Sequence, residues 1–308
     1  MLIVGGPDDL HAATVARGLA ARGVPAEHLD FADFPARAEL TWDPLARRGA
    51  LERPGRPPVA LERLRSVYWR TATRTRAAPG LQRDAHAFAE DESRRALECM
   101  LRSLACPVIN SPAAVAAHRL KPLQTTQVAA LGVPTPATLI TSSPAALRAF
   151  VAAQTSGVIV KPVGGGAYVR KLVPSDLERD ASIRACPMQY QAYIPGEDLR
   201  VYVIGERVFA ARVITADPSR VDFRTDPTHH SVAFTLGRDG EQRCLQIART
   251  LGLAFTGIDL RHTSANELVF LEANPSPMFL RFAADTGHPL AQALIDLLLV
   301  DPGAERAA

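Results

Sequence analysis

The sequence predicts a mixed α/β (α+β) protein with two domains, and three patterns lead to this expectation. Residues 1–31 alternate an apolar run, an amphipathic stretch that ends in glycine and a second apolar run, which is typical of a β-α-β opening. Residues 188–214 and 256–274 instead alternate strand-like runs with short polar turns, as antiparallel hairpins do. The chain has 308 residues, 47% of them hydrophobic, which is enough to bury two cores.

Composition narrows the class of protein. The formal net charge of +3 is small for this length and no run of like charges forms a stripe, so nucleic acid is not an expected partner. The opening residues lack a basic stretch followed by a long apolar one, and no other segment approaches membrane-spanning length without charges. We therefore expect a cytoplasmic protein with no membrane partner.

The four cysteines are Cys99, Cys106, Cys186 and Cys244. They show no CxxC spacing and no nearby set of histidines, which argues against a zinc site or a disulfide framework. We expect buried free thiols.

The first domain is expected to span residues 1–111 as a small Rossmann-like unit. Gly5 and Gly6 follow the first strand, but the fuller GxGxxG spacing is missing, so these glycines indicate a structural turn and not a dinucleotide site. Later in this domain the sequence predicts a helix over residues 87–105 and a strand and turn in CPVINSP.

The segment SVYWRTATRTR starts as a strand and then carries a group of basic and aromatic residues. These residues are Trp69, Arg70, Arg74 and Arg76. They either face a cleft or belong to a solvated basic loop, and the sequence favours neither interpretation.

The second domain, residues 112–308, contains the glycine-rich stretch GVIVKPVGGGAYVRKL. It predicts a strand that ends at Lys161, a turn of three glycines and a second strand. Without β-carbons, Gly164, Gly165 and Gly166 let their backbone amides approach a phosphate closely, and Lys161 adds positive charge. Taken alone this signal is weak, because a glycine-rich hairpin is often only a hairpin.

Oxygen-bearing side chains end the predicted strand VFLEAN. Alternation on a strand places Glu272 and Asn274 on the same face. Asp259 lies on the preceding strand, and a polar turn at residues 264–266 makes the two strands antiparallel neighbours. Mg²⁺ prefers oxygen ligands, usually one or two carboxylates completed by water and phosphate. The three residues therefore predict a magnesium site.

Taken in order, these motifs resemble the ATP-grasp ligases over residues 110–299. The ordered set is Lys121, Lys161 with its glycine turn, QAYIPGEDLR, Asp259, and Glu272 with Asn274. Within that superfamily the chain is similar to RimK-like enzymes, and more closely to the graspetide (microviridin-type) maturases, which crosslink ribosomal peptides. The closer similarity rests on VYWR, KPLQ with GVPTPATLIT, VDFR and LGLAFTGIDL. The chain departs from those maturases at two places. It has Phe223 where they usually have tryptophan, and SPMFLRF after Asn274 and Pro275 where they have a sequence that contains glycine and tryptophan.

The resemblance implies an ATP-grasp fold behind an N-terminal pre-ATP-grasp domain, with a lid subdomain over residues 125–195 and a catalytic subdomain after it. It also implies a mechanism in which ATP converts a carboxylate to an acylphosphate, which an amine or hydroxyl then attacks. Asp259, Glu272 and Asn274 would hold Mg²⁺, and Arg200 would stabilise the acylphosphate. The implied ATP contacts are Lys121, Lys161, Gly164, Gly165 and Gly166 on phosphate, the backbone of Gln191, Ala192, Tyr193 and Ile194 on adenine, and Glu197 or Asp198 on ribose.

Several residues keep two interpretations. Asp198 with Arg200 forms either part of the site or only a cross-face ion pair. Arg212 and Arg224 either clamp a substrate carboxylate in a bidentate fork or are plain surface arginines. His229 and His230 lie in a polar loop without a third ligand, so we expect them to face solvent or the substrate and not a metal.

The expected function is ATP-dependent ligation of a peptide side-chain carboxylate. The basic set Arg70, Arg74, Arg212 and Arg224 favours an acidic peptide as partner. Two alternatives stay open: a RimK-like ligase of a free amino acid or small acid, and a non-catalytic ATP-grasp-like module that binds a peptide. The sequence leaves a homodimer open.

Overall fold

The N-terminal part of the protein is built on a small parallel sheet. The structure, a computed structural model, describes residues 1–164, 168–217 and 220–300. The sheet has the order β2-β1-β6-β7, with β1 (Leu2–Val4), β2 (Glu27–Leu29), β6 (Val67–Trp69) and β7 (Val108–Ile109). Helix α1 (Leu10–Ala21) crosses from β1 to β2, and the Asp9 carboxylate caps it by accepting from the Ala12 amide at 2.9 Å. The predicted β-α-β opening is confirmed.

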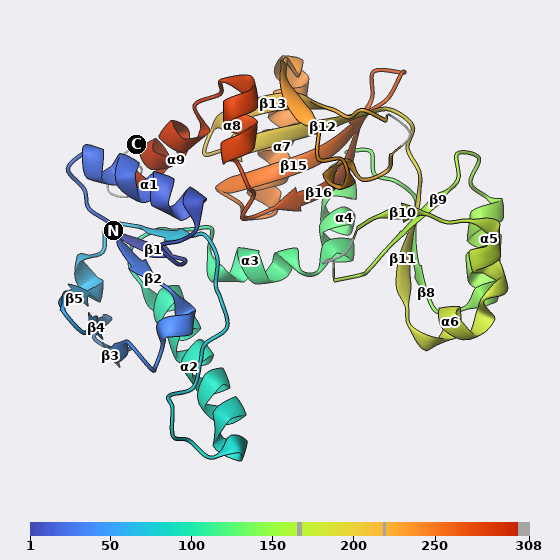
Figure 1. The fold of residues 1–308 in the computed structure, drawn as a ribbon. Coiled ribbons are helices and arrows are strands. Elements are labelled where there is room, and N and C mark those ends of the chain that lie inside the picture. Colours follow the sequence, from blue (N-terminus) through green and yellow to red (C-terminus); the bar gives the residue numbers. More distant parts are fainter. Residues whose placement is uncertain (165–167, 218–219, 301–308) are drawn as a thin grey trace.

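Two features extend from this sheet. An antiparallel meander, which the sequence analysis does not predict, contains β3 (Glu39–Asp43), β4 (Arg48–Arg53) and β5 (Arg56–Ala60). Helix α2 (Arg83–Ser103) covers most of the predicted helix 87–105, and its N-terminal end projects away from the rest of the chain (Figure 1). Short 3-10 turns, η1 (Phe31–Asp33) and η2 (Leu61–Arg63), connect the strands.

The middle of the chain forms a separate antiparallel sheet. Two helices, α3 (Pro112–His118) and α4 (Lys121–Ala129), lead into it. Its strand order is β10-β9-β11-β8, with β8 (Thr138–Thr141), β9 (Val158–Lys161), β10 (Arg170–Lys171) and β11 (Met188–Ala192). Helices α5 (Pro144–Ala152) and α6 (Asp180–Ala185) and the turn η3 (Pro174–Glu178) accompany the sheet. Val158, Val160 and Tyr190 pack with Leu147 and Ile183 of these helices, so the alternate residues of the strands are left for the opposite face.

The C-terminal part is a five-stranded antiparallel sheet of order β14-β13-β12-β15-β16. Its strands are β12 (Glu197–Ile204), β13 (Arg207–Ile214), β14 (His230–Phe234), β15 (Phe255–His262) and β16 (Leu268–Asn274). Helix α7 (Gly237–Thr250) covers one face, and α8 (Leu280–Thr286) and α9 (Leu290–Leu299) pack with residues of the other. The turn η4 (Phe223–Thr225) precedes β14.

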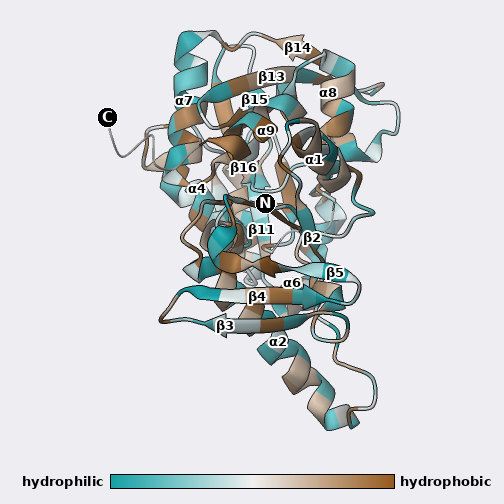
Figure 2. Ribbon diagram, turned by 90° about the vertical axis from the view of Figure 1, so that its left-hand side faces the viewer, coloured by the Kyte–Doolittle hydropathy of each residue, from teal (hydrophilic) through white to brown (hydrophobic). Residues whose placement is uncertain are grey.

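Alternation along β12 assigns its side chains to two different environments. Leu199, Val201 and Val203 are buried in the core with α7, whose outer side is hydrophilic (Figure 2). Burying side chains of this kind contributes roughly 1.5–3 kcal/mol each. The intervening Asp198 and Arg200 point to the opposite face, where a cavity opens. One face of this sheet therefore stabilises the fold, and part of the other holds the site.

The junction between the N-terminal and C-terminal parts is tightly bonded. The buried Asn110 side chain donates to the Phe255 and Pro275 carbonyls at 2.5 and 2.7 Å and accepts from the Phe255 amide at 3.0 Å. Helix α1 also packs against α9. The division at residue 112 stays a prediction; in the structure β7 ends at Ile109 and α3 begins at Pro112.

Among the described residues, no helix is both long and apolar enough to cross a bilayer. The four cysteines are free, as expected, but their predicted burial is correct only for Cys244. Cys99 and Cys186 are exposed and Cys106 is half-buried. Cys99 lies on α2, on the side of the helix opposite the buried Leu97, Met100 and Leu101.

Candidate functional site

A cavity of about 530 Å³ lies between the middle sheet and the C-terminal sheet. One wall comes from β9, β11 and the segment after β11, and the other from β12, β15 and β16. The predicted site residues that line it are Lys161, Gln191, Ala192, Tyr193, Ile194, Asp198, Arg200, Arg224, Asp259, Glu272 and Asn274. Residues more than one hundred positions apart in the sequence thus share one space.

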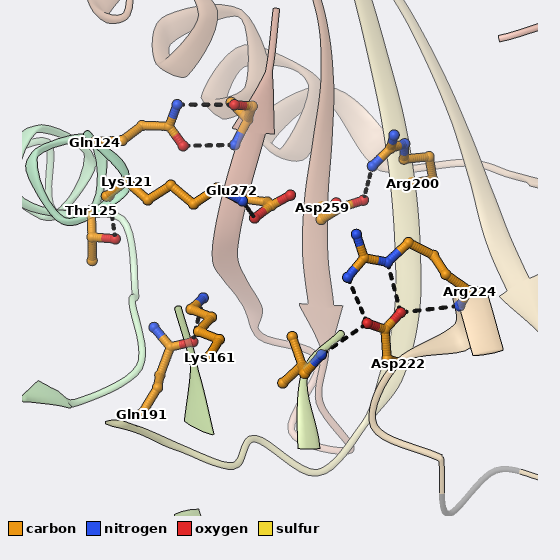
Figure 3. A network of polar contacts seen from close by, with 12 residues as sticks. Lys121, Gln124, Thr125, Lys161, Gln191, Arg200, Asp222, Arg224, Asp259 and Glu272 are labelled. Carbon is orange, nitrogen blue, oxygen red and sulfur yellow. Dashed lines mark hydrogen bonds and ion pairs between the residues drawn. The ribbon is translucent and has the colours of Figure 1, made fainter. Parts of the chain in front are cut away.

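Charged side chains form a row across three neighbouring strands at the floor of the cavity. Arg200 of β12 lies opposite Asp259 of β15, and Asp259 lies opposite Glu272 of β16. A bulge in the β15–β16 ladder falls directly after this last pair, a position where bulges commonly re-aim side chains. Arg200 forms an ion pair with Asp259 (Figure 3). The prediction that Asp259 neighbours Glu272 on an antiparallel strand is confirmed.

Lys121 reaches this row from helix α4. Its Nζ donates to Glu272 Oε2 at 2.6 Å. The next turn of the helix is fixed to the strand by Gln124, whose side-chain amide donates to the Ala273 carbonyl at 2.9 Å and accepts from the Ala273 amide at 2.8 Å (Figure 3). Gln124 and Ala273 are both buried, so these two bonds fix the position of α4 relative to β16. They thereby also keep Lys121 within reach of Glu272.

The two carboxyl groups have opposite pKa shifts. Burial raises the pKa of Asp259, and the neighbouring Glu272 charge adds to that rise, although Arg200 opposes it. Burial also acts to raise the pKa of Glu272, but the Lys121 charge and hydrogen bond outweigh it and hold the pKa below its ordinary value. Two acidic groups at this depth need cations nearby to remain ionised. The site is therefore arranged to hold positive charge between β15 and β16.

The Arg200 side chain lies directly over Gly257, which has no side chain to obstruct it. A β-carbon at this position would lie 3.2 Å from Arg200 Nε and 3.3 Å from its Cζ, and 2.9 Å from the Pro277 Cβ. The guanidinium therefore lies where a larger residue would exclude it.

Asn274 is oriented by a chain of contacts that begins in the N-terminal part. Its Oδ1 accepts from the Ser276 amide at 3.0 Å. The Arg70 guanidinium donates to the Ser276 carbonyl at 2.9 Å and to its hydroxyl at 2.8 Å, and pairs with Asp9 at 3.1 Å. Arg70 is only 6% exposed, so it is committed to these partners. The structure thus gives Arg70 a positioning contact that the sequence does not predict, and its predicted contact with an acidic peptide stays a prediction.

Lys161 ends β9 beside the buried amide of Gln191. Its Nζ donates to Gln191 Oε1 at 3.1 Å, and Gln191 Nε2 donates to the Thr138 hydroxyl at 2.9 Å. Burial lowers the pKa of Lys161, while the Glu272 charge acts to raise it. A part-buried lysine that is hydrogen-bonded to a neutral amide is well suited to an incoming anion.

The segment after β11 presents one unused amide. The Ala192 and Tyr193 amides donate to the carbonyls of Ala137 and Gly157, both at 2.9 Å. The Ile194 amide has no hydrogen-bond partner within the described part of the chain. The Tyr193 ring is flanked by two cations, with Lys171 Nζ 4.6 Å and Arg261 Cζ 5.7 Å from its centroid.

Asp198 lies at the same end of the cavity and pairs with Arg261 at 3.1 Å. Burial raises the pKa of Asp198 to about 6 against the opposing Arg261 charge. Arg261 also donates to the Gly196 carbonyl at 3.1 Å. Sequence reasoning did not name Arg261, although alternation from Asp259 along the same strand indicates it.

Arg224 is held in a fork by Asp222. Its Nε and Nη2 donate to the two Asp222 oxygens at 2.8 and 2.5 Å. The same carboxylate accepts from the Val169 amide at 3.1 Å, which ties this arginine to the chain just after the glycine turn (Figure 3). The Arg224 hydrogen bond holds the pKa of Asp222 low, although burial acts to raise it. Gly165 and Gly166 lie outside the described residues, and Gly164 does not line the cavity.

Glu197 and Arg212 lie away from the other predicted site residues. Arg212 pairs across the ladder with Leu199, which faces α7, and Glu197 shares that face by alternation. Their side chains lie 3.3 Å apart, and Glu197 also contacts His262 at 3.4 Å. Both predicted roles, ribose contact and substrate clamp, are therefore withdrawn for these two residues.

The remaining basic and histidine residues divide between two cavities and the surface. His229 lines the first cavity, and His230 is exposed. Trp69, Arg70 and Arg74 line a second cavity, as a cleft-facing segment would, whereas Arg76 is exposed and lines neither.

The donor set fits a hard divalent cation. Asp259, Glu272 and Asn274 present carboxylate and amide oxygens at one edge of the cavity. Among the described residues no group of three or more His, Cys, Asp or Glu side chains is placed to hold a metal ion, so the two carboxylates would need Asn274, phosphate or water as further ligands. Two carboxylates and an amide leave ligand positions for phosphate and water, which is the pattern Mg²⁺ favours.

Two antiparallel sheets that face one another across part-buried lysines and a carboxylate-lined floor define an ATP-grasp protein. The chain belongs to the RimK-like ATP-grasp family, whose domain model matches residues 117–298, more than half of its length. Among solved structures, ATP-grasp ligase PsnB complexed with minimal precursor is 30% identical with a TM-score of 0.82, over 97% of each chain. Macrocyclase MdnB from Microcystis aeruginosa MRC is 25% identical with a TM-score of 0.80, over 97% of this chain and 98% of the other.

Curated relatives cover less of the chain. It is 35% identical over 108 residues to "Probable alpha-L-glutamate ligase 2" of Hahella chejuensis (strain KCTC 2396), which is 34% of each chain. It is 28% identical over 164 residues to "Probable alpha-L-glutamate ligase 1" of Shewanella frigidimarina (strain NCIMB 400), which is 52% of each. The chain thus spans a third to a half of the curated relatives it matches. The predicted resemblance to RimK-like ATP-grasp proteins is confirmed.

Proposed function

We propose that the protein is an ATP-dependent, ADP-forming ligase that joins a carboxylate to an amine or a hydroxyl through an acylphosphate. The observation that supports this most directly is the charged row at the cavity floor. Arg200, Asp259 and Glu272 lie side by side on three strands, with Lys121 bonded to the last of them. Phosphoryl transfer is catalysed mainly by fixed charge and positioning, and this row supplies both.

ATP and Mg²⁺ are the expected cofactors, and PsnB has been solved with Mg and ADP. Asp259, Glu272 and Asn274 would hold the metal, which when bound neutralises charge on the phosphates. Lys161 and Lys121 supply the two nearby ammonium charges. Each loses a protein partner when phosphate arrives, which offsets part of the binding free energy.

The adenosine part would bind at the other end of the cavity. The unpartnered Ile194 amide can donate to an adenine ring nitrogen, because its neighbours are already bonded. The Asp198 carboxylate can accept from ribose hydroxyls while Arg261 holds it in place. The predicted phosphate contacts of Gly164, Gly165 and Gly166 stay predictions.

The chemistry needs two displacements. An oxygen of the substrate carboxylate attacks the γ-phosphorus, the bond to the bridging oxygen breaks, and ADP leaves with that electron pair. The amine or hydroxyl then attacks the acyl carbon, its proton is lost, and phosphate leaves. Arg200 would stabilise the phosphoryl charge and Arg224 would hold the substrate carboxylate, because both line the cavity and forked guanidinium groups suit both roles. Exclusion of water protects the acylphosphate from hydrolysis.

The preferred acceptor is a side-chain carboxylate of an acidic peptide, as in the maturation of ribosomal peptides. Similarity to PsnB, which was solved with its minimal precursor, supports this choice over most of the chain. Similarity to glutamate ligases supports a second candidate, ligation of a free amino acid, over a smaller part.

Mass spectrometry separates these candidates. The protein is incubated with ATP, Mg²⁺ and either acidic peptides or free glutamate. Loss of one water mass from a peptide per ADP released supports the peptide ligase. A condensed product from free glutamate with the peptides untouched supports the amino acid ligase. If the protein binds ATP but forms no product with either acceptor, the proposal is overturned and a non-catalytic binding module is the better description.

A further inference from the structure

A second cavity, of about 920 Å³, lies beside the first, and the proposed ligation steps do not use it. Its walls are the segment 69–75, one side of α2 and part of α3. We call it the α2 groove. Ser276 lines both cavities, so the α2 groove reaches the residue that orients Asn274. A molecule lying in the α2 groove can therefore extend toward the charged row.

The wall of the α2 groove is preorganised by hydrogen bonds. The Thr75 hydroxyl donates to the Glu90 carbonyl at 2.6 Å, which attaches the segment 69–75 to α2. At the other end of the segment, Arg70 is fixed to Asp9 and Ser276. A wall that is held at both ends loses little further entropy when a ligand binds.

The α2 groove carries more unpaired positive charge than negative charge. Arg94 pairs with Asp91 at 2.5 Å and with Glu98 at 2.9 Å, and Asp91 also pairs at 2.6 Å with Arg95 of α2, so these two carboxylates are balanced by two arginines. Three further lining arginines are exposed and have no side-chain hydrogen bond or ion pair within the described part of the chain: Arg74, Arg102 and Arg119. Of the lining carboxylates described, only Glu90 lacks an ion pair.

Size indicates the kind of ligand. A cavity of about 920 Å³ lies near the upper end of the range for bound small molecules, roughly 300–1,000 Å³. A single amino acid would leave most of it to water, whereas several residues of an extended peptide fill it. Three guanidinium groups, one from the loop, one from α2 and one from the residue that follows α3, match carboxylates that are also spread along a chain.

We propose that the α2 groove binds the acidic residues that flank the reacting side chain of a peptide substrate. This inference rests on the proposed ligase function and makes that function specific for peptides. The first cavity activates one carboxylate, and the α2 groove holds its neighbours by charge. Arg74, Arg102 and Arg119 are specificity-determining residues, and losing one weakens peptide binding without changing the nucleotide cavity.

The test uses the full chain and a short fluorescein-labelled peptide of alternating glutamate and threonine, followed by fluorescence anisotropy. Arg74→Glu, Arg102→Glu and Arg119→Glu reverse one groove charge each. Arg243→Glu is the matched control, because Arg243 is an exposed arginine of α7 that lines neither cavity. Each groove variant should bind the peptide about tenfold more weakly, and the control should stay within about twofold of wild type. A peptide with glutamine in place of glutamate should not bind.

Two further measurements keep the outcomes distinct. Calorimetric ATP affinity should be the same in all four variants, which shows that each folds with its nucleotide cavity intact. Peptide affinity that is unchanged in the groove variants, or equally reduced in Arg243→Glu, overturns the inference. The inference is also overturned if a groove variant changes the oligomeric mass in analytical ultracentrifugation but not the peptide affinity, because a second copy of the chain would then occupy the α2 groove. If peptide binding depends on the groove but no acceptor is ever ligated, the proposed ligase function fails while the groove assignment stands.

Discussion

Replacing Gln124 by alanine should lower the free energy of unfolding by roughly 2–4 kcal/mol. The Gln124 side chain is 5% exposed and bonds both backbone groups of the fully buried Ala273. Alanine would leave an N–H and a C=O without partners in the interior, and each such group costs about 1–3 kcal/mol. Relaxation of α4 toward β16 would recover part of this cost.

The same substitution should affect ATP use beyond its effect on stability. Lys121 lies one turn away on α4, and its ammonium reaches Glu272 only while the helix stays in register with β16. We expect KM for ATP to rise several-fold at saturating Mg²⁺, because phosphate contacts act in binding as well as in transfer. Urea unfolding followed by circular dichroism gives the stability change, and coupled ADP release gives KM and kcat.

Thr126→Ala is the matched control on the same helix. Its hydroxyl is exposed and donates to the Pro122 carbonyl of its own helix at 3.1 Å, with no further side-chain bond among the residues that the structure describes. That variant should change neither stability nor KM appreciably. If Gln124→Ala unfolds at the same urea concentration as wild type, the two bonds to Ala273 do not stabilise the junction and the reasoning is refuted.

Other consequences follow for the cavity itself. Glu272→Gln should abolish ADP release with an unchanged circular dichroism spectrum, and wild-type turnover would remove Glu272 from the metal site. Lys161→Ala should weaken ATP binding about tenfold by calorimetry, since it removes a buried charge from the phosphates; equal affinity would refute this. Because the pKa of Asp198 is raised to about 6, its carboxylate is protonated below that pH, so ATP affinity should fall from pH 7 to pH 5. Asp198→Asn should bind ATP equally at both pH values, and a slope that persists would contradict the ribose assignment. Gly257→Ala should displace Arg200 and reduce kcat more than ATP affinity, whereas normal kcat would show that the guanidinium can be accommodated elsewhere.

Much of the cavity floor could be predicted because its signals are local. Period-two alternation places Glu272 beside Asn274, and the turn between their strand and that of Asp259 makes the strands neighbours. The hairpin turn at Gly205 also fixes a register in which Arg212 pairs with Leu199. In that register Arg212 lies on the α7 face of the sheet with Leu199, so the distance from the turn argues against a place for Arg212 in the cavity.

Other features have no local signal. Arg70 and Ser276 meet across 206 positions, and nothing near either residue indicates the contact. The two hydrogen bonds between Gln124 and Ala273 likewise depend on how α4 packs against β16. A glutamine in a helix is usually exposed to solvent, so its sequence context does not indicate them. The meander over residues 39–60 was missed because its short strands are rich in charge and proline, which are depleted from typical strands.

The contact between Arg70 and Ser276 also limits how this chain can be divided or recombined. The segment that matches the family model, residues 117–298, contains Asn274 but not the arginine that holds the neighbouring backbone. Expressed alone, that segment would expose the Ser276 carbonyl and the two carbonyls bonded by Asn110. A chimaera that takes its first 111 residues from a relative would need an arginine and an asparagine at matching places, or Asn274, one of the three proposed magnesium ligands, would be free to turn.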